Sequence, residues 1–387
     1  MITKNQINQT GYFLMKRSDA VSAREAHSIL KYFRLIHQHP MSLFRHLIDR
    51  KLKKHKIDAL VSQRLKRIPS IVKKLKMQKS MQLARMQDIG GLRIVVDGVS
   101  EVNLIRDEIK KVESHSKFKF TFVNEKNYIK NPQKSGYRSI HMVYKYEKNI
   151  PSEKQCRVEI QIRTKLQHSW ATAVEVMGTY LNQPLKQSLG DDEYLDIFKK
   201  ISKLFIWLEE IGTDYALIKG EVGADYALIK EEVGADYALI KEVRQDIENI
   251  QLLEKLQNFT IVSQHLNDDS QGKYLLLKMN FKQKVIEIVR YAEAKFEQAN
   301  DDYLKMEEDN NGNQAVEVVL VSIQDVKKLS QSYPNYFMDT TEFINNLKLL
   351  FQILDMQNDA YYPKDEIIKQ ESERIFKEIF IKMTGKE

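Results

Sequence analysis

One segment near the middle of the chain alternates strictly between polar and aliphatic residues. Arg157–Thr164 reads RVEIQIRT, with a β-branched residue at every second inner position. Successive side chains of a strand point to opposite faces, so this pattern predicts a β-strand with one aliphatic face. The opposite face of this strand is expected to carry Glu159, Gln161 and Arg163.

The neighbouring sequence predicts an α/β domain around this strand. Short β-rich runs occur at 92–96, 118–123 and 139–146, and the helical pattern of 101–112 separates the first two. Helices that alternate with strands are expected to cover a sheet on both of its faces. We therefore expect the polar face of 157–164 to line a cleft. A strand that is simply half exposed is the alternative.

The N-terminal part is expected to be helical and basic. Between residues 23 and 79, apolar residues recur at three- and four-residue spacing, which predicts two or three amphipathic helices with a break at Pro40. From Arg45 to Lys79 the chain has thirteen Lys or Arg residues against two Asp residues. Such a segment favours an anionic partner, although a solvated helix face has the same composition.

The second half starts with further helices. Helical patterns run through 164–180 and 193–256, with a loop marked by Pro184 and Gly190 between them. Within the second pattern the hexapeptide DYALIK recurs every eleven residues, starting at Asp214. Eleven residues make three helical turns, so the repeat predicts one long, slightly right-handed helix. We interpret the repeat as a duplicated spacer.

The last third predicts a small α+β unit and gives no catalytic motif. Strands are expected at 260–264, 274–280, 285–289 and 315–321, and helices at 291–305 and 325–330. The predicted domains are an N-terminal helical segment (1–60), the α/β domain (61–182), a helical arm (183–258, with repeats at 214–242) and the α+β unit with a helical tail (259–387).

Composition excludes several classes of protein. The chain has a single cysteine, Cys156, and 42% hydrophobic residues, so it can bury a core and needs no disulfides. No apolar run is long enough to span a bilayer, and the first sixteen residues are too polar for a signal peptide. We expect a cytoplasmic protein without membrane contact.

Two polar motifs precede the central strands. In the first, cations from Arg64 to Lys74 surround a helix start at Pro69 and Ser70, which could bind phosphate or could be a plain basic helix surface. In the second, Asp88 precedes Gly90 and Gly91 at the mouth of a strand, where a hard cation could be held. The same residues are also ordinary in turns.

Two further motifs follow these. The loop 131–141 carries Tyr137, whose ring could stack on a base or could be the hydrophobic plug of a hairpin turn. The fourth motif is Arg157–Thr164 itself. The helix after it is expected to bury a stripe that includes Trp170 and to carry Glu175 on another face.

In this order the four motifs resemble the RelA/SpoT synthetase family, from about residue 60 to 180. The family patterns are RxKxxxSxxxK, DxxGxR, PxxSGYRSxH and EIQIRT, and they match at 64–74, 88–93, 132–141 and 159–164. The resemblance implies a nucleotidyltransferase-like mixed sheet flanked by helices. It also implies a Mg²⁺-dependent pyrophosphokinase that moves the β,γ-pyrophosphate of ATP to the 3′-hydroxyl of GTP or GDP. Metal ions, cations and a positioned hydroxyl are what such chemistry needs.

The resemblance also implies a role for individual residues. Asp88 and Glu159 would be catalytic and hold Mg²⁺, with Glu159 helping to deprotonate the attacking hydroxyl, and Tyr137 would stack on guanine. The ATP side would contain Arg64, Lys66, Ser70, Lys74 and Arg93. The acceptor side would further contain Lys134, Arg138, His141, Gln161 and Arg163.

The chain departs from the family at Asn127, where Asp is frequent, and at Gln133, where Lys is frequent. Glu175 follows the helix tryptophan by five residues, whereas the family's short forms have Glu four residues after it. About sixty residues precede the match and no histidine is followed by Asp, so we expect no hydrolase activity.

Other acceptors and partners stay open. A toxic relative that modifies the 3′ end of tRNA, or another purine nucleotide, is one alternative, and the basic segment could bind the tRNA backbone. An inactive nucleotide-binding module is another. A homo-oligomer and a neutralising antitoxin protein are also compatible with the sequence.

Overall fold

A computed structural model describes most of the chain. The described residues are 2–16, 20–78, 80–112, 120–147, 156–181, 183–218, 226–260, 274–280, 285–310, 316–322 and 340–358.

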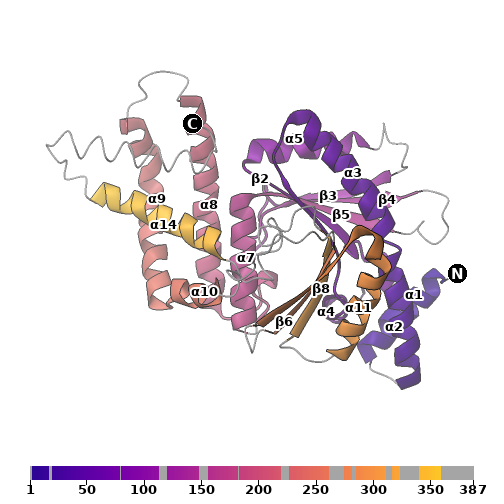
Figure 1. The fold of residues 1–387 in the computed structure, drawn as a ribbon. Helices are drawn as coiled ribbons and strands as arrows, with labels where there is room; N and C mark the ends of the chain where they lie inside the picture. Colours follow the sequence, from indigo (N-terminus) through magenta and orange to yellow (C-terminus); the bar gives the residue numbers. More distant parts are fainter. Residues whose placement is uncertain are drawn as a thin grey trace.

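The centre of the molecule is a mixed sheet of eight strands. Strands β2 and β5 are parallel, and all other neighbours are antiparallel. The α/β class with a mixed sheet flanked by helices is therefore confirmed (Figure 1). Along the sheet the order is β3 (Phe120–Asn127), β4 (Ile140–Tyr146), β5 (Arg157–Thr164), β2 (Gly90–Val96), β1 (Leu60–Leu65), β8 (Val316–Ser322), β6 (Tyr274–Asn280) and β7 (Val285–Tyr291).

One face of this sheet is apolar and is covered by two helices, α3 (Gln38–His55) and α5 (Val99–Lys110). The alternation predicted for β5 is confirmed, since Val158, Ile160 and Ile162 are fully buried in this layer. Their neighbours in the core come from β2, β4 and the inner sides of both helices. The polar residues of β5 therefore project from the opposite face.

Three N-terminal helices form a second cluster beside the sheet. Helices α1 (Lys4–Lys16), α2 (Ala20–Leu35) and α4 (Ile68–Met77) pack together around the short turn at Leu83–Arg85. Two expectations are corrected here. The break between α2 and α3 precedes Pro40, which lies in the first turn of α3, where the missing N–H of proline costs nothing. Residues 60–65, expected to be helical, form β1 because they pair along the whole of β2.

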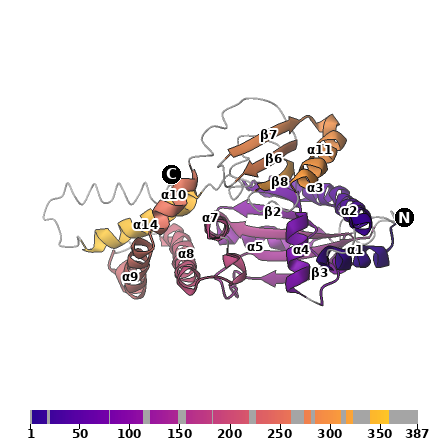
Figure 2. The same cartoon turned by 90° about the horizontal axis from the view of Figure 1, so that it is seen from below.

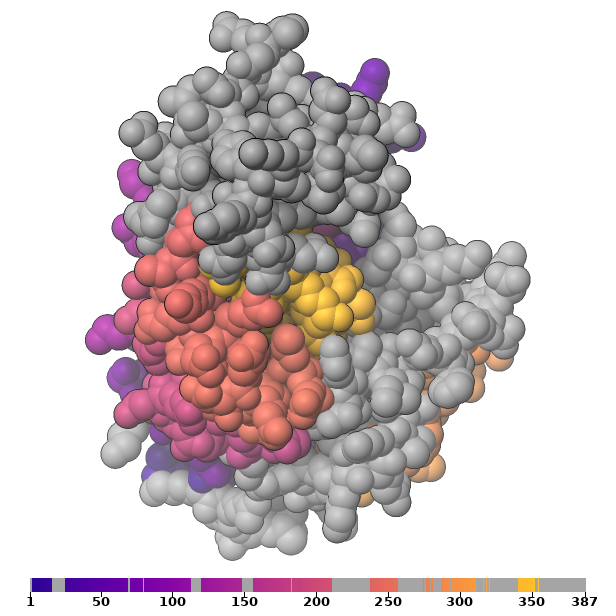
Figure 3. Space-filling view, turned by 90° about the vertical axis from the view of Figure 1, so that its left-hand side faces the viewer, coloured from indigo at the N-terminus to yellow at the C-terminus, as the bar shows by residue number. Residues whose placement is uncertain are grey.

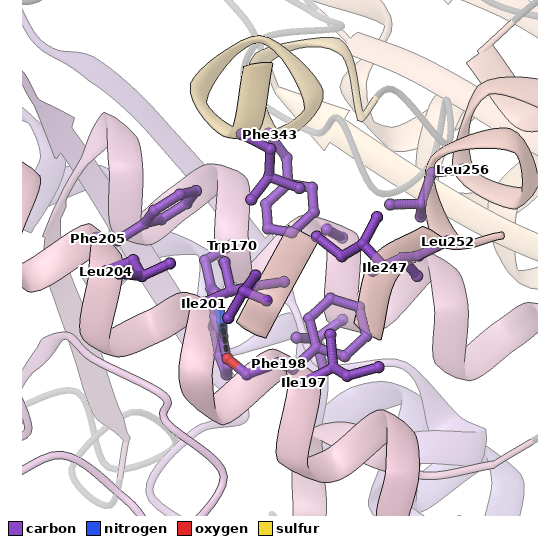
Figure 4. Close-up of a cluster of buried hydrophobic side chains, with 14 of the residues drawn as sticks. Trp170, Ile197, Phe198, Ile201, Leu204, Phe205, Ile247, Leu252, Leu256 and Phe343 are labelled. Atoms are coloured by element: carbon purple, nitrogen blue, oxygen red, sulfur yellow. Dashed lines mark hydrogen bonds between the residues drawn. The ribbon is translucent and has the colours of Figure 1, made fainter. Parts of the chain in front are cut away.

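Among the described residues, the largest hydrophobic core lies in a helical layer at one side of the sheet (Figure 2). Trp170, Phe198 and Phe343 meet at its centre, and the indole Nε1 of Trp170 donates to the carbonyl of Phe198 at 2.8 Å (Figure 4). In the space-filling view, α14 adjoins α9 and α10 (Figure 3). The layer consists of α7 (Lys165–Tyr180), α8 (Asp192–Ile218), α9 (Tyr226–Asn249), α10 (Leu252–Thr260) and α14 (Thr341–Asn358).

The prediction of one continuous helix through the repeats is wrong. Helices α8 and α9 lie side by side and antiparallel (Figure 1), and Lys200 of α8 pairs with Glu242 and Asp246 of α9 at 2.8 and 2.9 Å. In a single helix the 46 residues between Lys200 and Asp246 would span about 69 Å. The first repeat thus ends α8 and the later ones belong to α9, while 219–225 lie outside the described residues.

The C-terminal strands extend the central sheet. β8 pairs with β1 through Gln63 and Ser322, and α11 (Phe296–Asp309) packs on β6 and β8. The strands expected at 274–280, 285–289 and 315–321 are confirmed within two residues. The helix expected at 291–305 is α11, which starts later, at Phe296, and extends to Asp309.

The other strand and helix expected in the C-terminal region are not seen among the described residues. Thr260 ends α10 and is not in a strand, and 261–264 and 325–330 lie outside the described residues. Where one domain ends and the next begins stays a prediction. No helix among the described residues is long and apolar enough to cross a bilayer.

Candidate active site

The polar face of the sheet brings together residues from four strands. In the strand register Arg64 of β1 lies opposite Gly91 of β2, which in turn lies opposite Glu159 of β5. Facing residues of neighbouring strands project from the same side of a sheet. The adjacent row consists of Ser62, Arg93, Gln161 and His141. Residues predicted for the ATP side and for the acceptor side therefore share one surface.

A carboxylate held by two lysines lies at the β1 end of this face. Asp88 Oδ2 accepts from Lys66 Nζ and from Lys74 Nζ, both at 2.9 Å. Lys66 leaves β1 directly beside this carboxylate, since its backbone N–H donates to Ile89 O at 2.8 Å. Burial lowers the pKa of Lys66, although Asp88 opposes this shift. Three residues of the predicted site are thus in direct contact.

Glu159 is held by its strand neighbours. Its Oε2 accepts from Gln161 Nε2 at 2.8 Å, and its Oε1 lies 3.4 Å from His141 Nδ1. Burial would raise the pKa of Glu159, but His141, Gln161 and Lys74 outweigh it and lower the pKa to about 2. Glu159 is therefore ionised at neutral pH. Because Lys74 acts on both Glu159 and Asp88, the two predicted catalytic carboxylates share one cation.

Glu175 of α7 faces the arginines predicted for ATP. It pairs with Lys186 at 3.3 Å, in the short turn Leu185–Gln187. Burial would raise the pKa of Glu175, but Lys186, Arg64, Arg67 and Arg93 lower it to about 2. Glu175 is five residues after Trp170, one more than the spacing in the family's short forms. Its position on the polar stripe of α7 was the signal for this site.

Arg163 is the most unusual cation of the site. It is 2% exposed, and its Nε and Nη1 atoms are buried without a hydrogen-bond partner. Burial, followed by the positive charge of Arg93, lowers the pKa of Arg163 to about 9. Two buried guanidinium nitrogens without a hydrogen-bond partner are costly. An anionic ligand bound beside Arg163 would remove this cost.

Tyr137 lies against the helical core and is 4% exposed. Its hydroxyl is 2.9 Å from His141 Nε2, and the ammonium of Lys186 lies 5.6 Å from its ring centroid. Burial would raise the pKa of Tyr137, yet His141, Arg163 and Lys186 lower it. The buried ring suits the hairpin plug. Stacking on an acceptor base stays a prediction.

The remaining predicted residues are spread around the site. Ser70 is the third residue of α4, and Lys134 is exposed in the turn before Tyr137. Arg138 instead points to α8, where it pairs with the buried Glu209 at 2.6 Å. Asn127, which replaces the frequent Asp, accepts from the backbone of Ile129 and Lys130 and thereby shapes the turn after β3.

Sequence reasoning did not find that α8 holds the tyrosine loop. Ser202 Oγ donates to Gly136 O at 2.6 Å. About two helical turns further along α8, Glu209 forms an ion pair with Arg138. Glu209 also accepts from Gln167 and Thr164 at the start of α7. The loop and α7 are thus fixed to the same face of α8. The periodicity of α8 predicted the helix, but no local pattern shows which loop it contacts.

Two oxygen ligands are available for a divalent cation. Asp88 Oδ1 is buried without a hydrogen-bond partner, as expected for an atom that would ligate a metal. Glu159 would have to exchange its contacts with Gln161 or His141 for the ion. Among the described residues, no group of three or more His, Cys, Asp or Glu side chains forms a ready metal cluster. Such a site suits Mg²⁺, which keeps several water ligands and binds through substrate phosphates.

Comparison with known proteins places the sequence match on the strands and helices of this site. Residues 63–183 match the family model described as a region found in RelA/SpoT proteins. GTP pyrophosphokinase YjbM of Bacillus subtilis is 36% identical over 116 residues, which are 29% of this chain and 52% of that protein. YwaC of the same organism is 28% identical over 154 residues, 38% of this chain and 68% of that protein. The chain thus spans about half the length of YjbM.

A solved structure is also similar. Small alarmone synthetase 1 of Bacillus subtilis, bound to its product pppGpp, is 26% identical with a TM-score of 0.41. The alignment covers 52% of this chain and all of that one.

Proposed function

We propose that the protein transfers the β,γ-pyrophosphate of ATP to the 3′-hydroxyl of GTP or GDP, because residues 63–183 match the family model of a region found in RelA/SpoT proteins. The observation that carries the proposal is the shared polar face, where Asp88 and Glu159 lie among the cations of β1, α4, β2 and β5. Both family relatives are named GTP pyrophosphokinases.

The ATP side supplies charge neutralisation. Arg64, Lys66, Lys74 and Arg93 would bind the triphosphate. Phosphoryl chemistry depends mainly on positioning and on stabilising charge, so a preformed cationic face lowers the barrier. A Mg²⁺ ion held by Asp88 and Glu159 would add further charge stabilisation to the transferred group.

The acceptor side supplies a route for the proton. Glu159 is ionised, and its Oε1 is in contact with His141 Nδ1, whose other nitrogen reaches the hydroxyl of Tyr137. A ribose hydroxyl placed beside Glu159 would donate a hydrogen bond to this carboxylate, which would accept its proton as the new bond to phosphorus forms. Gln161 keeps the carboxylate turned toward the polar face.

Label transfer tests the proposal directly. Purified protein is incubated with Mg²⁺ and γ-³²P-ATP together with GTP, GDP, ATP or deacylated tRNA in separate reactions. We expect label in a guanine nucleotide that carries a 3′-pyrophosphate. Label in tRNA alone would support the toxic alternative, and nucleotide binding without any transfer would support an inactive module.

The position of α3 weakens the tRNA alternative. Lys53, Lys54 and Lys56 are exposed, but α3 covers the apolar face of the sheet, opposite to Glu159. If tRNA is the acceptor, changing these three lysines to Gln should reduce tRNA binding and flatten its salt dependence, by at most about 0.9 in slope for each phosphate contact. Transfer to GTP should not change.

A further inference from the structure

The C-terminal strands and α11 contact the elements that carry the ATP-side cations. β8 joins the free edge of β1 next to Arg64, through the pair Gln63 and Ser322. On the same side, α11 reaches α2 and the start of α4 (Figure 1). Residues 274–322 lie outside the region 63–183 that matches the family model.

Glu307 of α11 makes the central contact. One carboxylate oxygen accepts the backbone N–H of Ile68 at 3.3 Å, and the other accepts from Arg34 Nη1 at 3.0 Å. The guanidinium of Arg34 also donates to the hydroxyl of Tyr303, one turn earlier on α11. The side chains of Arg34 and Glu307 are 2% and 12% exposed. Glu307 is therefore a fixed link between α2 and α4.

The N-terminus of α4 depends on this link. Arg67, the residue before the helix, makes no side-chain capping bond, and Pro69 has no N–H. Glu307 supplies a carboxylate to the first N–H of the helix, where negative charge stabilises the positive end of the helix dipole. The far half of α4 is fixed separately, by the ion pair of Lys74 with Asp88.

We propose that Glu307 is a positioning residue for ATP, which orients α4 so that Ser70 and Lys74 face the polar surface of the sheet. This inference rests on the proposed pyrophosphokinase function. Among the residues that the structure describes, Tyr137 and His141 contact each other, β5 and the helical layer, whereas α11 packs on β6 and β8.

The KM values for the two substrates separate this role from a general loss of stability. Glu307→Gln keeps the size of the side chain but removes the charge that faces Arg34 and the helix. We expect the KM for ATP to rise about tenfold, with kcat and the KM for GTP changed less than twofold. Glu308→Gln is the matched control, because it removes the same charge from the exposed neighbouring position and should leave all constants unchanged.

A second variant keeps the proposal testable if Glu307→Gln does not fold. Glu307→Asp keeps a counter-ion for Arg34 but is one methylene too short to reach both partners, so it should raise the KM for ATP with a smaller loss of melting temperature. An unchanged KM for ATP in a folded variant, equal changes in both KM values, or a lower KM for ATP would each overturn the proposal. A lower value would mean that Glu307 competes with phosphate.

Binding of a non-hydrolysable ATP analogue distinguishes the two proposals. If the wild-type protein transfers no label to any acceptor, the proposed function fails, and calorimetry still tests Glu307. The analogue should then bind the wild type and Glu308→Gln equally, and Glu307→Gln about tenfold more weakly. Equal binding by all three proteins would overturn the role of Glu307.

Discussion

The hydroxyl of Ser202 donates to the carbonyl oxygen of Gly136 at 2.6 Å, and this bond joins α8 to the residue before Tyr137. Gly136 has a φ of +90°, and a Cβ atom there would lie 2.9 Å from Cβ of Ser202. Only glycine fits this close approach. The packing of α8, as well as the turn, therefore requires glycine at position 136, directly before Tyr137.

Ser202→Ala should loosen the tyrosine loop without unfolding the protein. The bond contributes about 1 kcal/mol, so the melting temperature should fall by a few degrees. We expect the KM for the acceptor to rise severalfold while the KM for ATP stays constant. Ser169→Ala is the control, because Ser169 is a buried serine of α7 that bonds Leu166 within its own helix. Identical kinetics in both variants would show that the bond is only structural.

Asp88→Asn and Glu159→Gln should each reduce transfer by at least about a hundredfold, because both remove a negative charge that would hold Mg²⁺. Both changes keep the shape of the side chain, so circular dichroism should stay close to that of the wild type. Asp88→Asn also leaves Lys66 and Lys74 without their carboxylate. Turnover like that of the wild type in either variant, at saturating Mg²⁺, would remove that residue from the catalytic site.

Replacing Tyr137 distinguishes a stacking residue from a plug. Tyr137→Phe loses only the contact with His141 and should keep the fold and most acceptor use. Tyr137→Ala removes a buried ring, which costs about 3–5 kcal/mol of stability. If the ring also stacks on the acceptor base, Tyr137→Ala should in addition weaken acceptor binding by ~1–3 kcal/mol, whereas the affinity for ATP should not change. A loss of stability that affects both substrates equally would favour the plug.

The sequence predicted the local elements of the sheet better than their partners. The alternation of Arg157–Thr164 is a property of adjacent residues, and the structure confirms both of its faces. The motifs likewise predicted Asp88, Lys66 and Lys74 for one site, and in the structure the two lysines pair with Asp88. By contrast, β1 pairs with β2 and β8 from distant parts of the chain, and its own residues resemble a helix surface.

Long-range contacts explain what the sequence could not predict. Eleven-residue periodicity is the same in one long helix and in two antiparallel helices, so the pairing of Lys200 with Asp246 has no local signal. The links of Glu209 to Arg138 and of Glu307 to Ile68 each join a motif residue to a residue outside the motifs, in the other half of the chain. Only the fold brings them together.

The buried His37 predicts that the protein loses stability in mild acid. His37 is 1% exposed between α2 and α3, and its Nδ1 is 2.7 Å from Phe33 O, so the neutral ring is expected to donate there. Burial, with a smaller contribution from Arg157, lowers the pKa of His37 from 6.5 to about 4. Between these two values the unfolded chain binds a proton that the folded protein does not bind. The stabilisation is therefore complete above pH 6.5 and is lost as the pH falls toward 4.

Urea unfolding of the wild type at pH 7 and at pH 4.5 should show this loss, which is on the order of 3 kcal/mol at most. His37→Gln can still donate to Phe33 O but does not titrate, so its stability should depend less on pH in this window. His46→Gln, an exposed position on α3, is the control and should keep the dependence of the wild type. Glu159 and Glu175, with pKa values lowered to about 2, lose their charge mainly below pH 4.5 and add their own destabilisation there. A parallel loss in His37→Gln and the wild type between pH 6.5 and 4.5 would assign the acid sensitivity to other groups.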